Sequence, residues 1–415
     1  MFAADNREFL AGQHDEPDYA MAARGAAQLL ADLGVSFRSL PYYFRIDAAA
    51  HAGLVRATHV LARAQDKLLR SLAATLSAEQ LVAMFEVPPD MAPHIDWTDV
   101  ASTGLRMLRA DIIPTEEGYY FCELNHFSGV GAGEGYHSAH AFAELLGRPV
   151  AGVSPFRQLA HLYATECRRT GRTRVVVLDT PQHRAQGFGE CLMLQRYLRL
   201  MAPDLDTSYH DEDTYPADWL RPGQARQTLV HRIVTHDDTP DGGAFLVRLR
   251  DSGVEVSTMF EAELKMHRRW FSLLCDPGYQ HLLDAEERAT IKQYVPHTYD
   301  LAPGTVDAAV ADKDRLVFKR SYTYGGKGVL VGDQHSPEQL RTLLTADGSA
   351  WVAQRRVYTS SLELRAADGR TVPYLFVLGM FLYGDQASGL LVRAAAHSPV
   401  VNVSQGGGAA WAFVE

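Results

Sequence analysis

The segment spanning residues 105–125, LRMLRADIIPTEEGYYFCELN, places the strongest constraint on the fold because it has the pattern of a β-hairpin. Two runs rich in Leu, Ile, Tyr and Phe flank the pentapeptide PTEEG, which begins at Pro114 and ends at Gly118. Proline fixes φ and glycine tolerates positive φ, so the chain is predicted to reverse there.

The register of this hairpin follows from the residue numbers. In an antiparallel pair the numbers of facing residues have a constant sum, and the pairs Arg109/Asn125 and Asp111/Glu123 share the same sum. Because side chains alternate between faces, all four polar side chains are expected on one face of the hairpin. The opposite face is expected to pack in the core through Leu108, Ala110, Ile112, Tyr120, Cys122 and Leu124.

The polar face of the hairpin predicts a metal site. Two carboxylates with Cβ atoms about 5 Å apart repel each other, and a cation between them removes the repulsion. Asp111, Glu123 and Asn125 offer the hard oxygen ligands that Mg²⁺ takes together with nucleotide phosphates. A solvated outer face with one Arg–Asp pair is the alternative.

Composition and charge bound the class of protein. The chain has 415 residues, 47% hydrophobic and 22% charged, which is typical of a globular protein with about two or three domains. A net charge of -10 argues against a broad nucleic-acid surface but allows a local basic pocket for phosphates. The four cysteines show no zinc or disulfide spacing, which favours a reducing cytoplasm.

The sequence shows no export or membrane signal. The first residues, MFAADNREFLAG, lack a basic stretch followed by an apolar one, so no secretory signal is predicted. The longest apolar run, residues 372–383, is too short to span a bilayer and has the Phe and Val content of a buried strand. We therefore expect a cytoplasmic protein without nucleic-acid or membrane partners, and the sequence leaves a homo-oligomer open.

The chain divides into four predicted segments. Residues 1–100 are expected to be helical, because apolar residues recur three and four apart from about Tyr19 to Phe85. Residues 101–150 hold the hairpin and a glycine-rich turn, residues 151–260 an α/β domain, and residues 261–415 a lid and the C-terminal strands.

The segment of residues 151–260 has the pattern of a small α/β sandwich. Its valine run, RTRVVVLDTP, is typical of a buried parallel strand that ends at Asp179. Open α/β sheets bind ligands at the carboxyl ends of their strands, so Asp179 either touches a ligand or caps a loop.

The first glycine-rich turn, residues 129–135, imitates a dinucleotide fingerprint. The fingerprint G-x-G-x-x-G has three glycines, but Glu134 takes the third position if it starts at Gly129, and Tyr136 takes it if it starts at Gly131. In addition, no acidic residue closes a second strand about twenty residues later. An NAD- or FAD-dependent oxidoreductase is therefore the less favoured alternative. The turn is expected to let backbone approach a ligand beside Asn125.

A second glycine-rich segment connects two predicted strands after Lys319. Its spacing excludes a Walker A loop, which would enter a helix, but backbone amides of such a loop with two lysines can cover a triphosphate. Gln354 lies on a later strand, where it could meet adenine. The predicted ATP contacts are Lys319, Gly325, Gly326, Lys327, Gly328 and Gln354.

Arg393 lies in a long apolar segment near the C-terminus. A buried arginine must be paired or meet an anionic ligand. Arg393 and Asn402 flank a turn at residues 397–399, so they are expected to share a face near Ser404. An ion pair between Arg393 and Glu363 is the alternative.

These motifs together resemble those of the ATP-grasp ligases, specifically the circularly permuted kind typified by the synthetase domain of glutathionylspermidine synthase and by related uncharacterised permuted proteins. In that family an R-x-D motif, a turn and an E-x-N motif hold magnesium ions, and the lid and hinge come later in the chain. Residues 109–111 and 123–125 stand in this order, and DAEERATIKQYVPHT resembles the linker ahead of the lid. The tail VRAAAHSPVVNVSQGGG resembles the uncharacterised proteins more closely. The resemblance covers Leu105 to the C-terminus.

The resemblance implies a fold of the α/β (α+β) class: an ATP-grasp architecture with permuted element order, a helical N-terminal region and a small α/β sandwich domain. It implies an ADP-forming ligase that uses ATP and Mg²⁺ to join a small-molecule carboxylate and an amine through an acyl phosphate. Asp111, Glu123 and Asn125 would hold the magnesium, and Arg109 and Arg393 would face the transferred phosphoryl group. A nucleotide-binding scaffold without catalysis is the alternative from another class.

Overall fold

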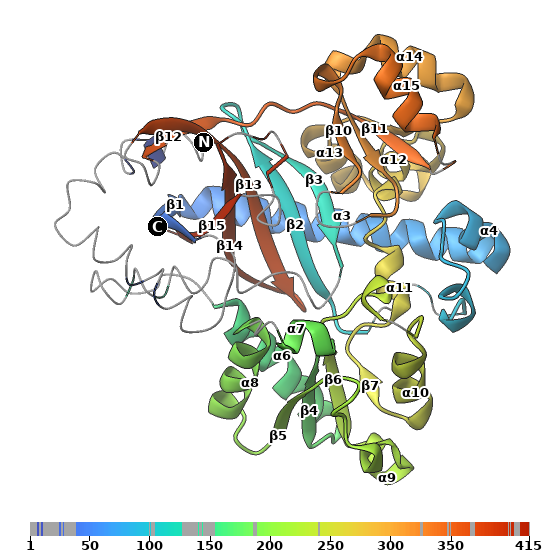
Figure 1. Cartoon of the computed structure of the whole chain (residues 1–415), viewed down its shortest axis with the longest axis vertical. Coiled ribbons are helices and arrows are strands. Elements are labelled where there is room, and N and C mark those ends of the chain that lie inside the picture. Colours follow the sequence, from blue (N-terminus) through green and yellow to red (C-terminus); the bar gives the residue numbers. More distant parts are fainter. Residues whose placement is uncertain are drawn as a thin grey trace.

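The computed structural model describes residues 39–98, 104–126, 154–185, 189–239, 241–323, 327–346, 350–365, 370–396 and 407–414, together with isolated positions before and between these ranges. In this part of the chain three β-sheets form the framework of the molecule (Figure 1). No helix within these ranges is long and apolar enough to cross a bilayer.

The central sheet joins the predicted hairpin to the C-terminal strands. Its strand order is β1-β15-β14-β13-β2-β3, and β12 pairs with β13 off this path. The β1–β15 pair is parallel, and the other pairs are antiparallel. The strands are β1 (Ser39–Ile46), β2 (Met107–Pro114), β3 (Tyr119–Asn125), β12 (Ser361–Arg365), β13 (Thr371–Tyr383), β14 (Gln386–Ala395) and β15 (Gly408–Val414). Strand β13 confirms the strand predicted over residues 372–383.

Strand β1 corrects the prediction of helix for residues 39–46. Tyr42 and Phe44 pack in one hydrophobic core, and Tyr43 between them packs in a second one on the opposite face of the strand. All three are at most 4% exposed. A strand buried on both faces shows no polar alternation, so periodicity alone cannot distinguish it from a buried helical segment. Aromatic residues favour the strand here because they fill both faces of the sheet.

Helix α3 (Ala48–Thr75) packs its apolar side against the central sheet. It begins after Asp47, whose carboxylate accepts hydrogen bonds from the first backbone amides and so caps the helix. Leu54, Leu61 and Leu68, spaced seven residues apart, are buried in the same core as strands β2 and β13. This spacing keeps one face of the helix toward the sheet. The shorter helix α4 (Ala78–Met84) follows.

A second unit, in green at the lower end of Figure 1, surrounds the sheet β5-β4-β6-β7. All its strand pairs are parallel, which confirms the predicted parallel strand before Asp179. Its strands are β4 (Arg174–Leu178), β5 (Asp206–His210), β6 (Thr228–Arg232) and β7 (Glu255–Val256). Its helices are α6 (Pro155–Thr170), α7 (Pro181–Ala185), α8 (Gly189–Met201), α9 (Pro222–Ala225) and α10 (Ala244–Ser252).

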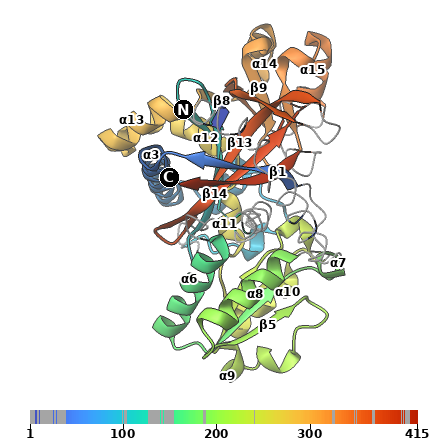
Figure 2. The ribbon, with the colours of Figure 1, turned by 90° about the vertical axis from the view of Figure 1, so that its left-hand side faces the viewer.

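The third sheet, at the opposite end of the molecule in Figure 2, is antiparallel with the order β10-β9-β11-β8. Strands β9 and β10 are consecutive, as predicted for the second glycine-rich segment. The strands are β8 (Thr298–Asp300), β9 (Leu316–Arg320), β10 (Val329–Val331) and β11 (Trp351–Arg355). The helices of this part of the chain are α11 (Phe260–Leu264), α12 (Arg269–Cys275), α13 (Ala285–Tyr294), α14 (Val306–Ala311) and α15 (Pro337–Thr345).

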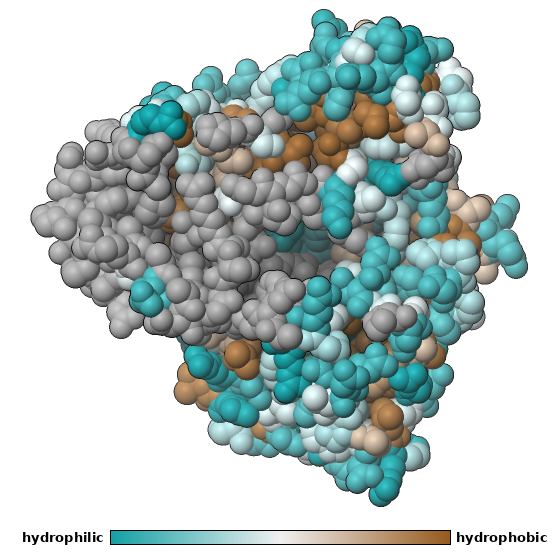
Figure 3. Space-filling view, in the orientation of Figure 1, coloured by the Kyte–Doolittle hydropathy of each residue, from teal (hydrophilic) through white to brown (hydrophobic). Residues whose placement is uncertain are grey.

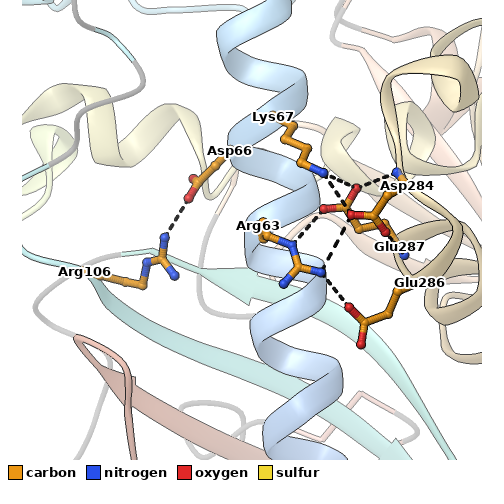
Figure 4. A network of polar contacts seen from close by, with 7 residues as sticks. All are labelled: Arg63, Asp66, Lys67, Arg106, Asp284, Glu286 and Glu287. Atoms are coloured by element: carbon orange, nitrogen blue, oxygen red, sulfur yellow. Dashed lines mark hydrogen bonds and ion pairs between the residues drawn. The ribbon is translucent and has the colours of Figure 1, made fainter.

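Ion pairs join helix α3 to helix α13 (Figure 4). Glu287 has no exposed side-chain surface, and its carboxylate meets both Arg63 Nε at 3.0 Å and Lys67 Nζ at 2.8 Å. Arg63 also contacts Glu286, and Lys67 also contacts Asp284. These contacts hold helix α13, which also packs against β3, in place beside the central sheet.

Candidate active site

Strands β2 and β3 pair in the predicted register. Arg109 faces Asn125, and Asp111 faces Glu123. All four side chains line one cavity, so the predicted convergence of the polar groups is confirmed.

A β-bulge between Asp111 and Ile112 changes the predicted core face of the hairpin. Beyond the bulge, Ile112 faces Phe121 instead of Cys122. An extra residue in one strand reverses its alternation between faces. Phe121 is therefore fully buried, while Cys122 lines the cavity and Tyr120 is half-buried. The prediction that Tyr120 and Cys122 pack in the core is wrong for this reason.

Asp111 lies between two guanidinium groups. Arg109 Nε is 2.8 Å from its Oδ1 atom, and Arg393 Nη2 is 2.7 Å from its Oδ2 atom. Burial raises the pKa of Asp111, but the two arginines outweigh this effect and hold the pKa below its usual value. Gly379 faces Asp111 on β13 and leaves room for Arg109, since a Cβ there would lie 3.0 Å from Arg109 Cδ. The alternative partner of Arg393, Glu363, is exposed and does not pair with it.

Glu123 and Asn125 complete the polar face. The Oε1 atom of Glu123 lies 3.5 Å from Arg268 Nε, and Asn125 Nδ2 donates to the carbonyl oxygen of Arg109 over 3.3 Å. Within the described part of the chain, no three His, Cys, Asp or Glu side chains form a group that could hold a metal ion. The magnesium site therefore stays a prediction based on two carboxylates and one amide oxygen.

Lys319 and Gln354 reach the same cavity from the third sheet. Lys319 Nζ donates to the carbonyl oxygen of Cys122 over 2.9 Å, which joins the two sheets. Burial lowers the pKa of Lys319, and Cys122 and Glu123 offset part of this effect. Gln354 is 4% exposed, and its amide donates to Thr298 Oγ1 over 3.0 Å.

The cavity between the hairpin and the third sheet has a volume of about 250 Å³. Six cationic side chains and two carboxylates line it: Arg109, Asp111, Glu123, Arg268, Lys319, Arg355, Arg356 and Arg393. An apolar wall consists of Ile113, Val317, Val329, Val331, Val357, Leu375 and Val377. Figure 3 shows the surface hollowed at the centre of this face, with hydrophobic residues gathered below helices α14 and α15. This lining suits a ligand with a polyanionic part and an apolar part.

Arg268 is a cavity residue that the sequence analysis does not single out. Its side chain is 3% exposed. Besides facing Glu123, it donates from Nη1 to Thr323 Oγ1 over 2.8 Å and to the Lys327 carbonyl oxygen over 3.1 Å. Arg268 therefore joins the base of the glycine-rich loop to the hairpin. The sequence signal is the pair Arg268-Arg269 directly before the apolar run WFSLLC, because buried arginines require acceptors.

The glycine-rich loop is described only in part. Gly325 and Gly326 lie outside the described residues. Lys327 is exposed and is not among the described residues that line the cavity. Gly328 has a φ of +63°, and a Cβ there would lie 2.7 Å from Arg320 Cβ, so the turn requires glycine.

Other sequence predictions fall elsewhere. The glycine-rich turn at residues 129–135, Asn402 and Ser404 lie outside the described residues. Asp179 is 3% exposed and accepts hydrogen bonds from Tyr209 Oη and Cys191 Sγ, both over 3.0 Å. Asp179 thus has its partners inside the unit around the parallel sheet, which supports the alternative that it holds a loop and does not touch a ligand.

The overall fold occurs in a known structure. The chain is similar to a glutathione synthetase-like effector from Globodera pallida, solved in its apo form, with a TM-score of 0.60 and 11% sequence identity. The similarity covers 95% of this chain and 96% of that chain. The protein therefore shares the mixed α/β fold of that effector.

Two further solved structures are more distant. A proposed γ-glutamylcysteine synthetase from Methylobacillus flagellatus KT has a TM-score of 0.42 and 11% identity over 83% of this chain and 85% of that chain. A carboxyaminoimidazole ribonucleotide synthase from Aspergillus clavatus, complexed with ATP, has a TM-score of 0.23 and 15% identity over 57% of this chain and 61% of that chain. No protein-family model and no curated protein matches the chain.

Proposed function

We propose that the protein is an ATP-dependent carboxylate–amine ligase that forms an amide through an acyl phosphate and releases ADP and phosphate. One observation carries the proposal: Asp111 and Glu123 share a single cavity with Lys319, Gln354 and an apolar wall. A nucleotide uses both kinds of lining, because its base is flat and weakly polar while its phosphates are polyanionic. The fold shared with a glutathione synthetase-like protein agrees with a ligase. The order of the motifs supports a circularly permuted ATP-grasp enzyme.

ATP would lie between the hairpin and the third sheet. Lys319 would contact the phosphates from β9, and Gln354 would meet adenine from β11. The backbone amides of Gly325, Gly326 and Gly328, with Lys327, would cover the phosphates. Arg268 would hold the base of this loop in position through Thr323 and the Lys327 carbonyl group.

The donor set of the hairpin fits magnesium. Asp111, Glu123 and Asn125 provide hard oxygen atoms at adjacent positions of two paired strands, and Mg²⁺ in nucleotide sites is usually held by one or two carboxylates together with phosphates. When bound, the ion would neutralise phosphate charge. Arg109 and Arg393 add positive charge beside Asp111.

The first chemical step would be phosphoryl transfer. A substrate carboxylate oxygen forms a bond to the γ-phosphorus, and the bond from this phosphorus to the β,γ-bridging oxygen breaks, with its electron pair going to ADP. Catalysis of this step is mostly positioning and charge stabilisation. Arg109 and Arg393, held by Asp111, would face the transferred group.

The second step would form the amide. The nitrogen lone pair of the amine attacks the acyl carbon, the bond from this carbon to the phosphate oxygen breaks, and the amine proton passes to phosphate or water. The cavity's excess of cations would stabilise the departing phosphate.

Trapping the acyl phosphate tests this function. The purified protein is incubated with ATP, magnesium, hydroxylamine and a panel of amino acids and dicarboxylic acids, and hydroxamate and ADP are measured. We expect both products with at least one acid, and a loss on the order of a thousandfold in Glu123→Gln. If ATP binds but no acid of the panel gives hydroxamate or ADP, the nucleotide-binding scaffold is the better account.

A further inference from the structure

A second cavity, with a volume of about 170 Å³, lies where strand β2 begins and strand β3 ends. Its polar lining includes Arg106 before β2, His126 after β3, Asp66 and Arg70 on helix α3, and Lys265 after helix α11. None of its lining residues lines the first cavity. It is therefore a separate site.

Positive charge exceeds negative charge in the second cavity. Asp66 is the one carboxylate among its lining residues. The two oxygens of Asp66 are already shared, with Lys265 Nζ at 2.7 Å and Arg106 Nη2 at 2.9 Å. Figure 4 shows Asp66 on α3 pointing toward Arg106, away from the side of the helix that carries Arg63 and Lys67. Arg70 is a third, exposed cation.

Two polar groups of this cavity are deeply buried. The side chain of Lys265 is 4% exposed, and burial lowers its pKa although Asp66 offsets part of the effect. His126 is 5% exposed, and its Nε2 atom is buried without a hydrogen-bond partner among the described residues. Buried polar atoms nearly always have a partner, so this one requires an explanation. A bound oxyanion would accept a hydrogen bond from His126 and balance the excess positive charge.

We propose that the second cavity binds a small oxyanion, a carboxylate or a phosphate group. The site lies apart from the proposed ligase chemistry, because successive residues of an extended chain point to opposite faces and His126 directly follows Asn125. An anion can therefore occupy it while the first cavity holds a nucleotide. Its position at the end of the hairpin makes it an accessory site next to the strands that carry Asp111 and Glu123.

Thermal unfolding without nucleotide or magnesium tests the proposal. Wild type is compared in potassium phosphate, potassium succinate, potassium acetate and potassium chloride at equal ionic strength. A ligand that binds only the folded state raises the unfolding temperature. We expect a saturable rise above the chloride value that depends on Arg70, and the anion that produces it identifies the source as phosphate or carboxylate. No rise above chloride with any of these anions would overturn the proposal.

Variants on helix α3 locate the effect. Arg70→Gln removes an exposed cation of the cavity. It should weaken binding of the anion that stabilises wild type about fivefold, which is the size expected for loss of an exposed ion pair. Arg56→Gln, at another exposed arginine of the same helix, should bind as wild type does. Asp66→Asn, which removes the competing carboxylate, should bind more tightly. Equal affinity of Arg70→Gln and wild type would place the anion elsewhere and contradict the proposal, whatever the outcome of the hydroxamate test.

Discussion

Asp111 is buried between Arg109 and Arg393, and each of its oxygens meets one guanidinium group. Its charge therefore has a structural effect that is separate from any ligand. Arg393 is 4% exposed, so without Asp111 its charge would be buried and unbalanced. Breaking one side of such a buried pair typically costs about 3–5 kcal/mol.

The stability difference between wild type and Asp111→Asn should depend on pH. The folded pKa of Asp111 is below its usual value, so its ionisation stabilises the fold above about pH 4, and the contribution is lost as pH falls through the folded pKa. Urea unfolding should show Asp111→Asn about 3 kcal/mol less stable than wild type at neutral pH. This difference in the free energy of unfolding should become smaller in acid. Asp385→Asn, at a side chain that is 89% exposed, serves as the control. A difference in the free energy of unfolding that does not change with pH would contradict this account.

The sequence predicts the polar face of the hairpin but not all its neighbours. The register of a short hairpin follows from the position of its turn and from the alternation of side chains between its two faces. The facing pairs Arg109/Asn125 and Asp111/Glu123 could therefore be predicted from the residue numbers alone. The bulge that brings Cys122 into the cavity depends on how β2 packs between two other strands. No local pattern encodes that packing.

At the scale of elements, the candidate site depends on contacts between the hairpin and the third sheet. Lys319 reaches the Cys122 carbonyl group from β9. Arg268 bonds the ends of the glycine-rich loop and faces Glu123. Sequence analysis missed Arg268 because its partners lie more than fifty residues away and two are backbone carbonyls.

Replacing Arg268 by lysine should weaken nucleotide binding. Lysine keeps the charge but lacks the planar set of donors that bonds several acceptors at once. We expect about tenfold weaker binding of an ATP analogue by calorimetry, equal to about 1.4 kcal/mol. Arg269→Lys is the matched control, because Arg269 pairs with Asp300 at 2.8 Å and does not line the cavity. Equal affinities of the two variants would show that Arg268 does not position the loop.

The ion pairs between α3 and α13 give a stability prediction. Glu287→Gln removes a carboxylate with no exposed surface that meets two cations, so we expect a loss of about 3 kcal/mol in the free energy of unfolding. Glu286→Gln, at a side chain that is 57% exposed, should cost less than about 1 kcal/mol. Urea unfolding of both variants checks this. Similar losses in the two variants would contradict the role of burial.

For the whole molecule, the central sheet and the third sheet meet around the candidate site, and the fold is that of the Globodera pallida effector. The strands and helices with clear periodicity could be predicted, including β4, β9, β10 and β13. Strand β1 could not, since burial on both faces removed its alternation. Nor could the pairing of β1 with β15, which joins chain segments more than three hundred residues apart.

The measurement that tests the central claim most directly is thermal unfolding of wild type, Glu123→Ala and the control Glu117→Ala with a magnesium complex of a non-hydrolysable ATP analogue, or with NAD. A ligand at about 100 times its Kd stabilises by about 2.7 kcal/mol, which for a chain of this size means roughly 3 °C. We predict a magnesium-dependent shift with the ATP analogue in wild type and Glu117→Ala, and its loss in Glu123→Ala. A shift with NAD alone, or an undiminished shift in Glu123→Ala, would contradict the assignment of this cavity to ATP and magnesium.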